Sequence, residues 1–341
     1  MLNEKSDGKF DEAINIISKE LKKKLENLPM QLKNNTHEIR LRTAKPIVLF
    51  GNYGSVYLKL DNSTSQDANE QMYICSIQTI TDTFNRLCCY SIHTHQNSII
   101  NGYITMKGGH RAGVVGTAVC SNENKITSIK DVSTINIRIA RQKFGCADEL
   151  IKKLYSNELQ SVLIAGPPSS GKTTLLRDLV RQLSSNSFNY KISVIDEREE
   201  IAAVCDGVAQ NDLGFNCDVL DSYPKKEAIL CAIKTMSPQI IACDEVGTQE
   251  EIQAIKLGVN TGVKFIVTIH ASSFDELIDR PQVQNLLSTY SFNKVVLLKN
   301  SDEPCQIQSI FDARELRNEI YRSEPIMGSV DYDWYKQSLE I

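Results

Sequence analysis

Long apolar runs are absent from this sequence of 341 residues. No stretch approaches the roughly 18 apolar residues that a membrane-spanning helix needs. The N-terminal segment MLNEKSDGKFDEAINIISKE is polar and lacks the apolar core of a signal peptide. We therefore expect a soluble protein that is made and kept in the cytoplasm, with no direct insertion into a membrane.

A strong excess of one charge is also missing. The 38 basic and 42 acidic residues leave a formal net charge of -4, whereas a protein that coats nucleic acid shows a clear basic excess. We therefore expect no nucleic-acid partner. The hydrophobic fraction of 41% and the charged fraction of 23% are those of a globular protein, and they exclude a disordered or fibrous chain. At roughly 150 residues per domain, the length suggests two domains.

Cysteine, by contrast, is plentiful, with ten residues in the chain. Four cysteines lie within apolar stretches: Cys75, Cys120, Cys231 and Cys243. Because there is no export signal, we expect buried thiols in a reducing compartment rather than disulfides. A second group combines cysteine and histidine: Cys88, Cys89, His93 and His95. Adjacent cysteines lack the C-x2-C spacing of a zinc site, and no second pair follows, so no metal is expected there.

Residues 1–145 are expected to form a mixed α+β domain. The opening segment has apolar residues at spacings of three and four, which predicts one amphipathic helix that ends at Pro29. Its apolar stripe consists of Ile14, Ile17, Leu21, Leu25 and Leu28. Further elements are predicted as strands over 38–42, 46–50 and 55–60, a helix over 77–89, and a hairpin from 103–106 and 111–119 around Gly108 and Gly109.

Residues 146–312 show a different pattern, in which apolar strands alternate with amphipathic helices. This alternation predicts an α/β fold with a mainly parallel sheet. Strands are predicted over 161–165, 191–196, 240–244, 264–270 and 294–298. Helices are predicted over 173–183, 225–236, 248–259 and 275–287. Residues 313–341 form a C-terminal extension, which is either docked or frayed.

The segment GPPSSGKT at 166–173 matches the phosphate-binding pattern G-x-x-x-x-G-K-[ST], with an apolar strand before it and an amphipathic helix after it. Its glycines let successive N–H groups point at phosphate oxygens, and the helix N-terminus adds a positive dipole. Lys172 would neutralise phosphate charge, and the Thr173 hydroxyl would hold Mg²⁺. The residues expected to bind the nucleotide are Gly166, Pro167, Pro168, Ser169, Ser170, Gly171, Lys172, Thr173 and Thr174.

Two other apolar strands end in carboxylates that would complete such a site. The strand at 240–244 delivers Asp244 toward Mg²⁺, and the adjacent Glu245 can polarise the attacking water. The strand at 191–196 is followed by Glu197, which is a rival general base. Parallel strands bring their carboxyl ends to one edge of the sheet, where α/β proteins bind ligands. The sequence leaves open which of the two glutamates is the base.

A fourth strand ends in His270, which either senses the γ-phosphate by hydrogen bonding or caps the strand. The guanine-reading pattern N-K-x-D is missing, because NKVV at 293–296 lacks the aspartate. Adenine is therefore the expected base, and ATP and Mg²⁺ are the expected ligands.

Together, the P-loop, IDER at 195–198, IIACDEVG at 240–247 and TIHA at 268–271 resemble the secretion and type IV pilus ATPases of the RecA-like/AAA superclass. In that group these segments are called Walker A, Asp box, Walker B and His box. Longer strings resemble the stage III sporulation protein AA family, up to about residue 312. They are HEIRLR (37–42), NGYITMKGGHRAGVVGTA (101–118), INIRIAR (135–141), DVLDSYPKKEA (218–228) and TMSPQIIACDEVG (235–247).

The resemblance implies a RecA-like P-loop NTPase core preceded by a smaller α+β domain. It also implies a homo-hexamer that works as the cytoplasmic ATPase of a secretion-like channel complex in endospore formation, docked on the cytoplasmic face of a membrane channel protein. In the secretion ATPases, arginines of the N-terminal domain or of a neighbouring subunit reach the nucleotide. The corresponding candidates here are Arg138, Arg141, Arg111 and Arg198.

Two other functions are compatible with a P-loop. A RecA-like ATPase directed by nucleic acid would need a basic surface that bears aromatic residues, and the mild acidity of the chain argues against it. A nucleotide-gated scaffold would turn over little ATP, and the intact pair of Asp244 and Glu245 argues against such a dead site.

Overall fold

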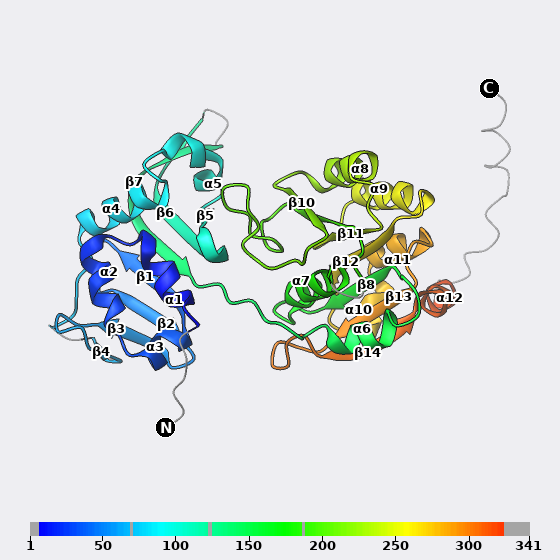
Figure 1. The fold of residues 1–341 in the computed structure, drawn as a ribbon, viewed down its shortest axis with the longest axis horizontal. Coiled ribbons are helices and arrows are strands. Elements are labelled where there is room, and N and C mark those ends of the chain that lie inside the picture. Colours follow the sequence, from blue (N-terminus) through cyan, green and yellow to red (C-terminus); the bar gives the residue numbers. More distant parts are fainter. Residues whose placement is uncertain (1–6, 69–70, 122–124, 186–187, 324–341) are drawn as a thin grey trace. The chain divides into compact units, whose positions relative to one another are not determined.

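In the computed structural model, the chain is described over residues 7–68, 71–121, 125–185 and 188–323. It divides into two compact units, each built around its own sheet (Figure 1). The first unit comprises Met1–Gln142 and Ala202–Asp212, and the second comprises Lys143–Ile201 and Leu213–Ile341. No helix in these described stretches combines the length and the apolar character that crossing a bilayer demands.

The first unit contains an antiparallel sheet of seven strands in the order β4-β3-β2-β1-β7-β6-β5. The strands are β1 (Thr36–Arg42), β2 (Val48–Gly51), β3 (Gly54–Leu58), β4 (Thr64–Ser65), β5 (Tyr103–Thr105), β6 (Arg111–Cys120) and β7 (Ile126–Arg138). In β1 the buried Ile39 and Leu41 alternate with the partly exposed Glu38 and Arg40, because one face of the sheet packs on the core. The strands predicted for this unit and its hairpin are confirmed, whereas β7 was not predicted.

Helices pack on this sheet and bury the predicted apolar stripe. They are α1 (Lys9–Ala13), η1 (Ile14–Ile16), α2 (Lys19–Glu26), α3 (Met30–Asn35), α4 (Ile77–Leu87), η2 (Ile92–His95), α5 (Gln96–Ile100) and η3 (Lys107–Gly109). The prediction of one continuous opening helix is wrong. The chain is extended at Ile17, with ψ of 152°, and the Ser18 N–H donates to Thr83 Oγ1 in α4 at 3.1 Å. This tertiary hydrogen bond replaces a helical one.

The second unit contains a sheet in the order β10-β9-β11-β12-β8-β13-β14. Its strands are β8 (Val162–Gly166), β9 (Ile192–Asp196), β10 (Cys217–Asp221), β11 (Ile240–Cys243), β12 (Lys264–His270), β13 (Lys294–Leu298) and β14 (Ile307–Asp312). Neighbouring strands pair in parallel from β10 to β13, and β14 is antiparallel. All five predicted strands are present, and the α/β class is confirmed. The edge strands β10 and β14 were not predicted.

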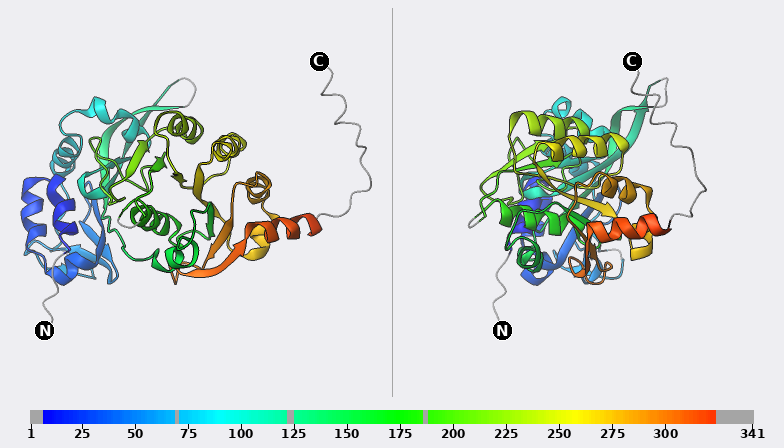
Figure 2. Two further views of the ribbon diagram at one scale, coloured as in Figure 1. Left: turned by 45° about the vertical axis from the view of Figure 1, so that its right-hand side comes forward. Right: turned by 90° about the vertical axis from the view of Figure 1, so that its right-hand side faces the viewer.

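Helices cover both faces of this second sheet (Figures 1 and 2). They are α6 (Asp148–Leu154), α7 (Lys172–Leu183), α8 (Lys225–Thr235), α9 (Gln249–Asn260), α10 (Phe274–Asp279), α11 (Pro281–Ser288) and α12 (Ala313–Ser323). One cluster of buried side chains joins α8, α9, α11 and α12 to the sheet, and α7 contributes nothing to it. Because α7 instead packs on β8 and β12, it covers the opposite face.

One helix prediction needs correction, and one open alternative is decided. The helix expected over 275–287 is two helices, because Pro281 lacks the N–H that would continue α10 and instead occupies the first turn of α11. The C-terminal extension begins as α12, whose Ala313, Leu316 and Ile320 are buried in the core. Its start is therefore docked, and residues 324–341 lie outside the described residues.

The cysteines are less uniformly buried than their sequence context suggests. Cys75 and Cys243 are buried, but Cys231 is partly exposed and Cys120 is exposed near the end of β6. In the group near residue 90, Cys88 is buried and Cys89 is exposed. Within the part of the chain that the structure describes, no three cysteine, histidine or acidic side chains gather as a metal site would require.

The segment Ala202–Asp212 follows β9 along the chain but belongs to the first unit. The Gly108 N–H donates to Gln210 Oε1 at 2.8 Å. The side-chain amide of Gln142 exchanges two hydrogen bonds with the main chain of Asp212, at 2.7 and 2.8 Å. The segment is therefore tied to the β5–β6 turn by one hydrogen bond and to Gln142, after β7, by two.

Close packing of α9 on β12 gives a test of this core. A Cβ at Gly258 would lie 2.6 Å from Cζ of the fully buried Phe265. We expect Gly258→Ala to lower the free energy of unfolding by about 1–3 kcal/mol, although alanine favours helices. Gly247→Ala is the matched control, since a Cβ there meets nothing within 4 Å. Urea denaturation measures both, and equal stability of the two variants would contradict the packing described.

Candidate nucleotide site

The phosphate-binding loop lies between β8 and α7. Gly171 is the N-cap of α7 and has a φ of +86°, and Ser169 has a φ of +60°. A Cβ at Gly171 would lie 2.6 Å from Cys305 Sγ, so glycine is required there both for backbone conformation and for space. Ser170 Oγ is buried and has no hydrogen-bond partner among the described residues. A phosphate oxygen would satisfy that hydroxyl, so the loop fits a phosphate group.

Lys172 is 6% exposed and points back over the loop. Its Nζ donates to the carbonyl oxygens of Gly166 and Pro167 at 2.9 and 2.8 Å and lies 3.2 Å from His270 Nδ1. Burial lowers the pKa of Lys172, and the nearby carboxylate of Asp244 opposes that shift. The ammonium is thus held over the loop by two carbonyl oxygens and an imidazole nitrogen.

Thr173 and Asp244 meet across the site. The Thr173 hydroxyl donates to Asp244 Oδ2 at 2.5 Å. On its other side, Asp244 accepts a hydrogen bond from the Thr268 hydroxyl of β12. A hydroxyl and a carboxylate beside a phosphate-binding loop are the oxygen ligands that Mg²⁺ prefers. These residues therefore fit a magnesium ion.

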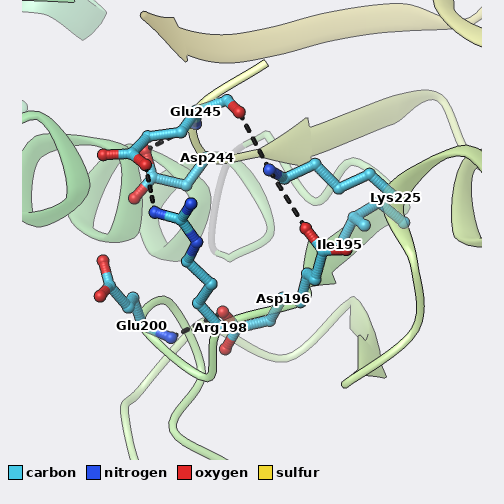
Figure 3. A pocket seen from close by; sticks show the side chains of 8 residues that line it. Ile195, Asp196, Arg198, Glu200, Lys225, Asp244 and Glu245 are labelled. Atoms are coloured by element: carbon cyan, nitrogen blue, oxygen red, sulfur yellow. Dashed lines mark hydrogen bonds and ion pairs between the residues drawn. The ribbon is translucent and has the colours of Figure 1, made fainter. Parts of the chain in front are cut away.

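Glu245 follows Asp244 and points into a pocket at the edge of the sheet (Figure 3). Its Oε1 lies 2.8 Å from His270 Nε2, and Arg198 donates to its Oε2. Burial alone would raise the pKa of Glu245, but the hydrogen bond from His270 and the charge of Arg198 outweigh it and lower the pKa. Glu245 is therefore held as a carboxylate.

Glu197 lines the same pocket, and its side chain is 37% exposed. Its Oε2 lies 3.3 Å from Lys225 Nζ. The preceding Asp196 serves the backbone instead, because its Oδ1 accepts the N–H groups of Glu200 and Ile201 at 2.7 and 3.0 Å. Both glutamates considered as bases are therefore present at one pocket.

The four candidate arginines have different surroundings. Arg198 lies in the pocket with Glu245 (Figure 3). Arg141 is engaged inside the first unit, where it donates to Asp7 Oδ2 at 2.5 Å and to the Thr36 carbonyl at 2.7 Å. Two more arginines also lie in the first unit. Arg138 is largely exposed, with Nε 3.9 Å from Glu38, and Arg111 stacks over Tyr103 at 4.9 Å from the ring centroid.

Two residues of the site were not foreseen from the sequence. Thr268 binds Asp244 and accepts the Glu245 N–H at 2.9 Å, and Lys225 donates to the Glu245 carbonyl oxygen at 2.9 Å. The available signal for Lys225 was a lysine directly after Pro224 at the start of a predicted helix. For Thr268 it was a hydroxyl two residues before His270 in an otherwise apolar strand.

The fold resembles those of secretion and pilus ATPases. The ATPase DotB of Legionella pneumophila superposes with a TM-score of 0.53 at 18% identity, over 89% of this chain and 84% of that one. The pilus retraction motor PilT, solved with bound ADP, superposes with a TM-score of 0.53 at 14% identity, over 84% of each chain. The chain therefore shares the fold of these two ATPases.

Sequence comparison identifies the family of the chain. The family described as "Sporulation stage III, protein AA" matches residues 7–318. The stage III sporulation protein AA of Bacillus subtilis (strain 168) is 34% identical over 306 residues, covering 89% of this chain and 95% of that protein. The chain belongs to the stage III sporulation protein AA family, as its sequence strings indicated.

The depressed pKa of Glu245 gives a pH prediction. A carboxylate with a lowered folded-state pKa stabilises the fold above its unfolded-state pKa, and that contribution is lost as the pH falls. We expect the free energy of unfolding of the wild type, relative to Glu245→Gln, to decrease between about pH 6 and about pH 3. Urea denaturation across this range measures it, with the exposed Glu250→Gln as control. A difference that does not change with pH would contradict the ion pairing described.

Proposed function

We propose that this protein is a Mg²⁺-dependent ATPase that energises assembly of, or transport through, a secretion-like channel complex in endospore formation. The observation that carries the proposal is the 2.5 Å hydrogen bond between Thr173 and Asp244. It joins the first turn of the P-loop helix to the acidic end of β11, as a site for a nucleotide and its metal requires. Family membership supports the link to sporulation.

In this proposal the loop of Gly166, Pro167, Pro168, Ser169, Ser170, Gly171, Lys172, Thr173 and Thr174 holds the triphosphate of ATP. Main-chain N–H groups and the Ser170 hydroxyl donate to phosphate oxygens. Lys172 exchanges its carbonyl partners for the β- and γ-phosphates, which are stronger acceptors because they are charged. Mg²⁺, held by Thr173 and Asp244, supplies positive charge next to the phosphates.

Glu245 is our proposed general base, with Glu197 as the alternative. A base for water must be ionised, and the lowered pKa of Glu245 meets that need. His270 bridges Lys172 and Glu245 at 3.2 and 2.8 Å, so it is suited to report the γ-phosphate to the base. Arg198 holds the second oxygen of the same carboxylate.

The larger organisation is also proposed. We divide the chain into an α+β domain over 1–145, a RecA-like ATPase domain over 146–312 and an extension over 313–341. A homo-hexamer would let Arg138, Arg141 or Arg111 serve the site of a neighbouring subunit, since guanidinium matches phosphate geometry. The ring would work in the cytoplasm, peripheral to a membrane and docked on the cytoplasmic face of a channel protein.

ATP hydrolysis over a series of protein concentrations tests the proposal. We expect specific activity that rises with concentration, because an oligomer completes the site, and that disappears in Lys172→Ala. Lys152→Ala, which changes an exposed lysine of α6, should retain the wild-type rate. ATP binding without turnover at any concentration would contradict the proposal and favour a scaffold. Strong stimulation by nucleic acid would instead favour a nucleic-acid-directed ATPase.

The two glutamates can be separated by matched amide substitutions. We expect Glu245→Gln to lower kcat by about 10²–10⁴-fold, the range for loss of a general base, with ATP binding retained. Glu197→Gln should cost less, because this side chain makes one ion pair at the pocket rim. Steady-state kinetics and nucleotide titration measure both variants. A larger loss in Glu197→Gln would reverse the assignment.

A further inference from the structure

A buried lysine outside the phosphate-binding loop connects the two strand ends that carry the glutamates. Lys225 is the first residue of α8 and is 7% exposed. Its Nζ lies 2.9 Å from the Glu245 carbonyl oxygen, 3.3 Å from Glu197 Oε2 and 3.9 Å from Glu251 Oε1. In Figure 3 its side chain extends from α8 toward the main chain of Glu245. A buried ammonium is costly unless it is paired, so these partners fix its position.

The main chain of Glu245 is where this lysine acts. Glu245 has a φ of +48°, a left-handed conformation that side chains other than glycine rarely adopt. Both of its polar main-chain groups are hydrogen-bonded, the N–H to Thr268 Oγ1 at 2.9 Å and the carbonyl oxygen to Lys225 Nζ at 2.9 Å. Such a conformation persists only where the surroundings hold it. The bonds therefore set the direction in which the Glu245 side chain leaves the strand.

The lysine is itself anchored on a rigid carboxylate. Glu251 accepts the N–H groups of Gly247 and Thr248 at 2.8 and 3.0 Å, which closes the capping box of α9. Because its other oxygen faces Lys225, the ammonium is held between a fixed carboxylate and the more exposed Glu197. The Lys225 ammonium thus links both candidate bases to Glu251, which is fixed in the capping box of α9.

We propose that Lys225 is a positioning residue of the ATPase reaction, orienting Glu245 through its main chain and Glu197 through an ion pair. This inference rests on the proposed ATPase function. Every partner of the ammonium among the described residues lies outside loop 166–173. Lys225 therefore acts on turnover and leaves nucleotide binding unchanged.

Lys225→Met tests the inference, since methionine fills the site without a charge or a donor. We expect kcat to fall by about tenfold to a hundredfold, the usual cost of a misplaced reacting group, while KM for ATP and Kd for ADP stay within about twofold. Lys226→Met, at the exposed next residue of α8, should match the wild type. Lys225→Arg keeps the cation and should recover most of the lost kcat.

A double-mutant cycle separates positioning from mere support of the fold. If Lys225 acts by orienting Glu245, Lys225→Met should cost less kcat in a Glu245→Gln background than in the wild type, because coupled residues are not additive. Purely structural damage would lower kcat by the same factor in both backgrounds. Thermal unfolding shows whether Lys225→Met is folded. If it is not, Lys225→Gln takes its place in the same cycle.

The outcomes distinguish this inference from the proposed function. If the wild type is active and the kcat of Lys225→Met lies within about twofold of the wild-type kcat, the inference is overturned and the ATPase proposal stands. An additive double-mutant cycle has the same meaning. A wild type that hydrolyses no ATP at any concentration overturns both.

Discussion

The parallel register of β8, β12, β11 and β9 is the constraint on which the candidate site depends. In this sheet His270 lies opposite Gly166, and Cys243 lies opposite Ile195. The loops that follow these strands therefore start from one edge, where parallel sheets gather functional groups. Lys172 consequently contacts His270, which lies 98 residues away in the sequence, and Thr173 contacts Asp244, which lies 71 residues away.

Polar contacts join the strand ends at this edge. Lys172, His270, Glu245 and Arg198 form one continuous series, and Lys225 ties Glu245 to Glu197 at the neighbouring strand end. Such ion pairs are weak contributors to stability, because desolvation or exposure to solvent offsets their attraction. Their consequence is a defined geometry. Among the described residues, a triphosphate would compete with two carbonyl oxygens and an imidazole for Lys172 Nζ, while Asp244 and Glu245 are already in place.

Short-range patterns explain how much of this could be predicted from sequence. The P-loop is encoded by adjacent residues, and Asp244, Glu245 and His270 follow apolar strands, so their common location follows from the alternation of strands and helices. Lys225 was missed because its role depends on a contact 20 residues away. The break at Ser18 was missed for the same reason, since its partner is 65 residues distant. The surface strands β10 and β14 lack the apolar runs that revealed the central ones.

The central claim is that Lys172, Thr173 and Asp244 form one nucleotide site. A structure of the full chain with Mg²⁺ and a non-hydrolysable ATP analogue tests it most directly. The account predicts the β- and γ-phosphates within loop 166–173, the Lys172 ammonium moved from its carbonyl partners to phosphate oxygens, and the metal next to Thr173. A nucleotide bound elsewhere, or a loop that stays closed on Lys172 at saturating analogue, would contradict the account.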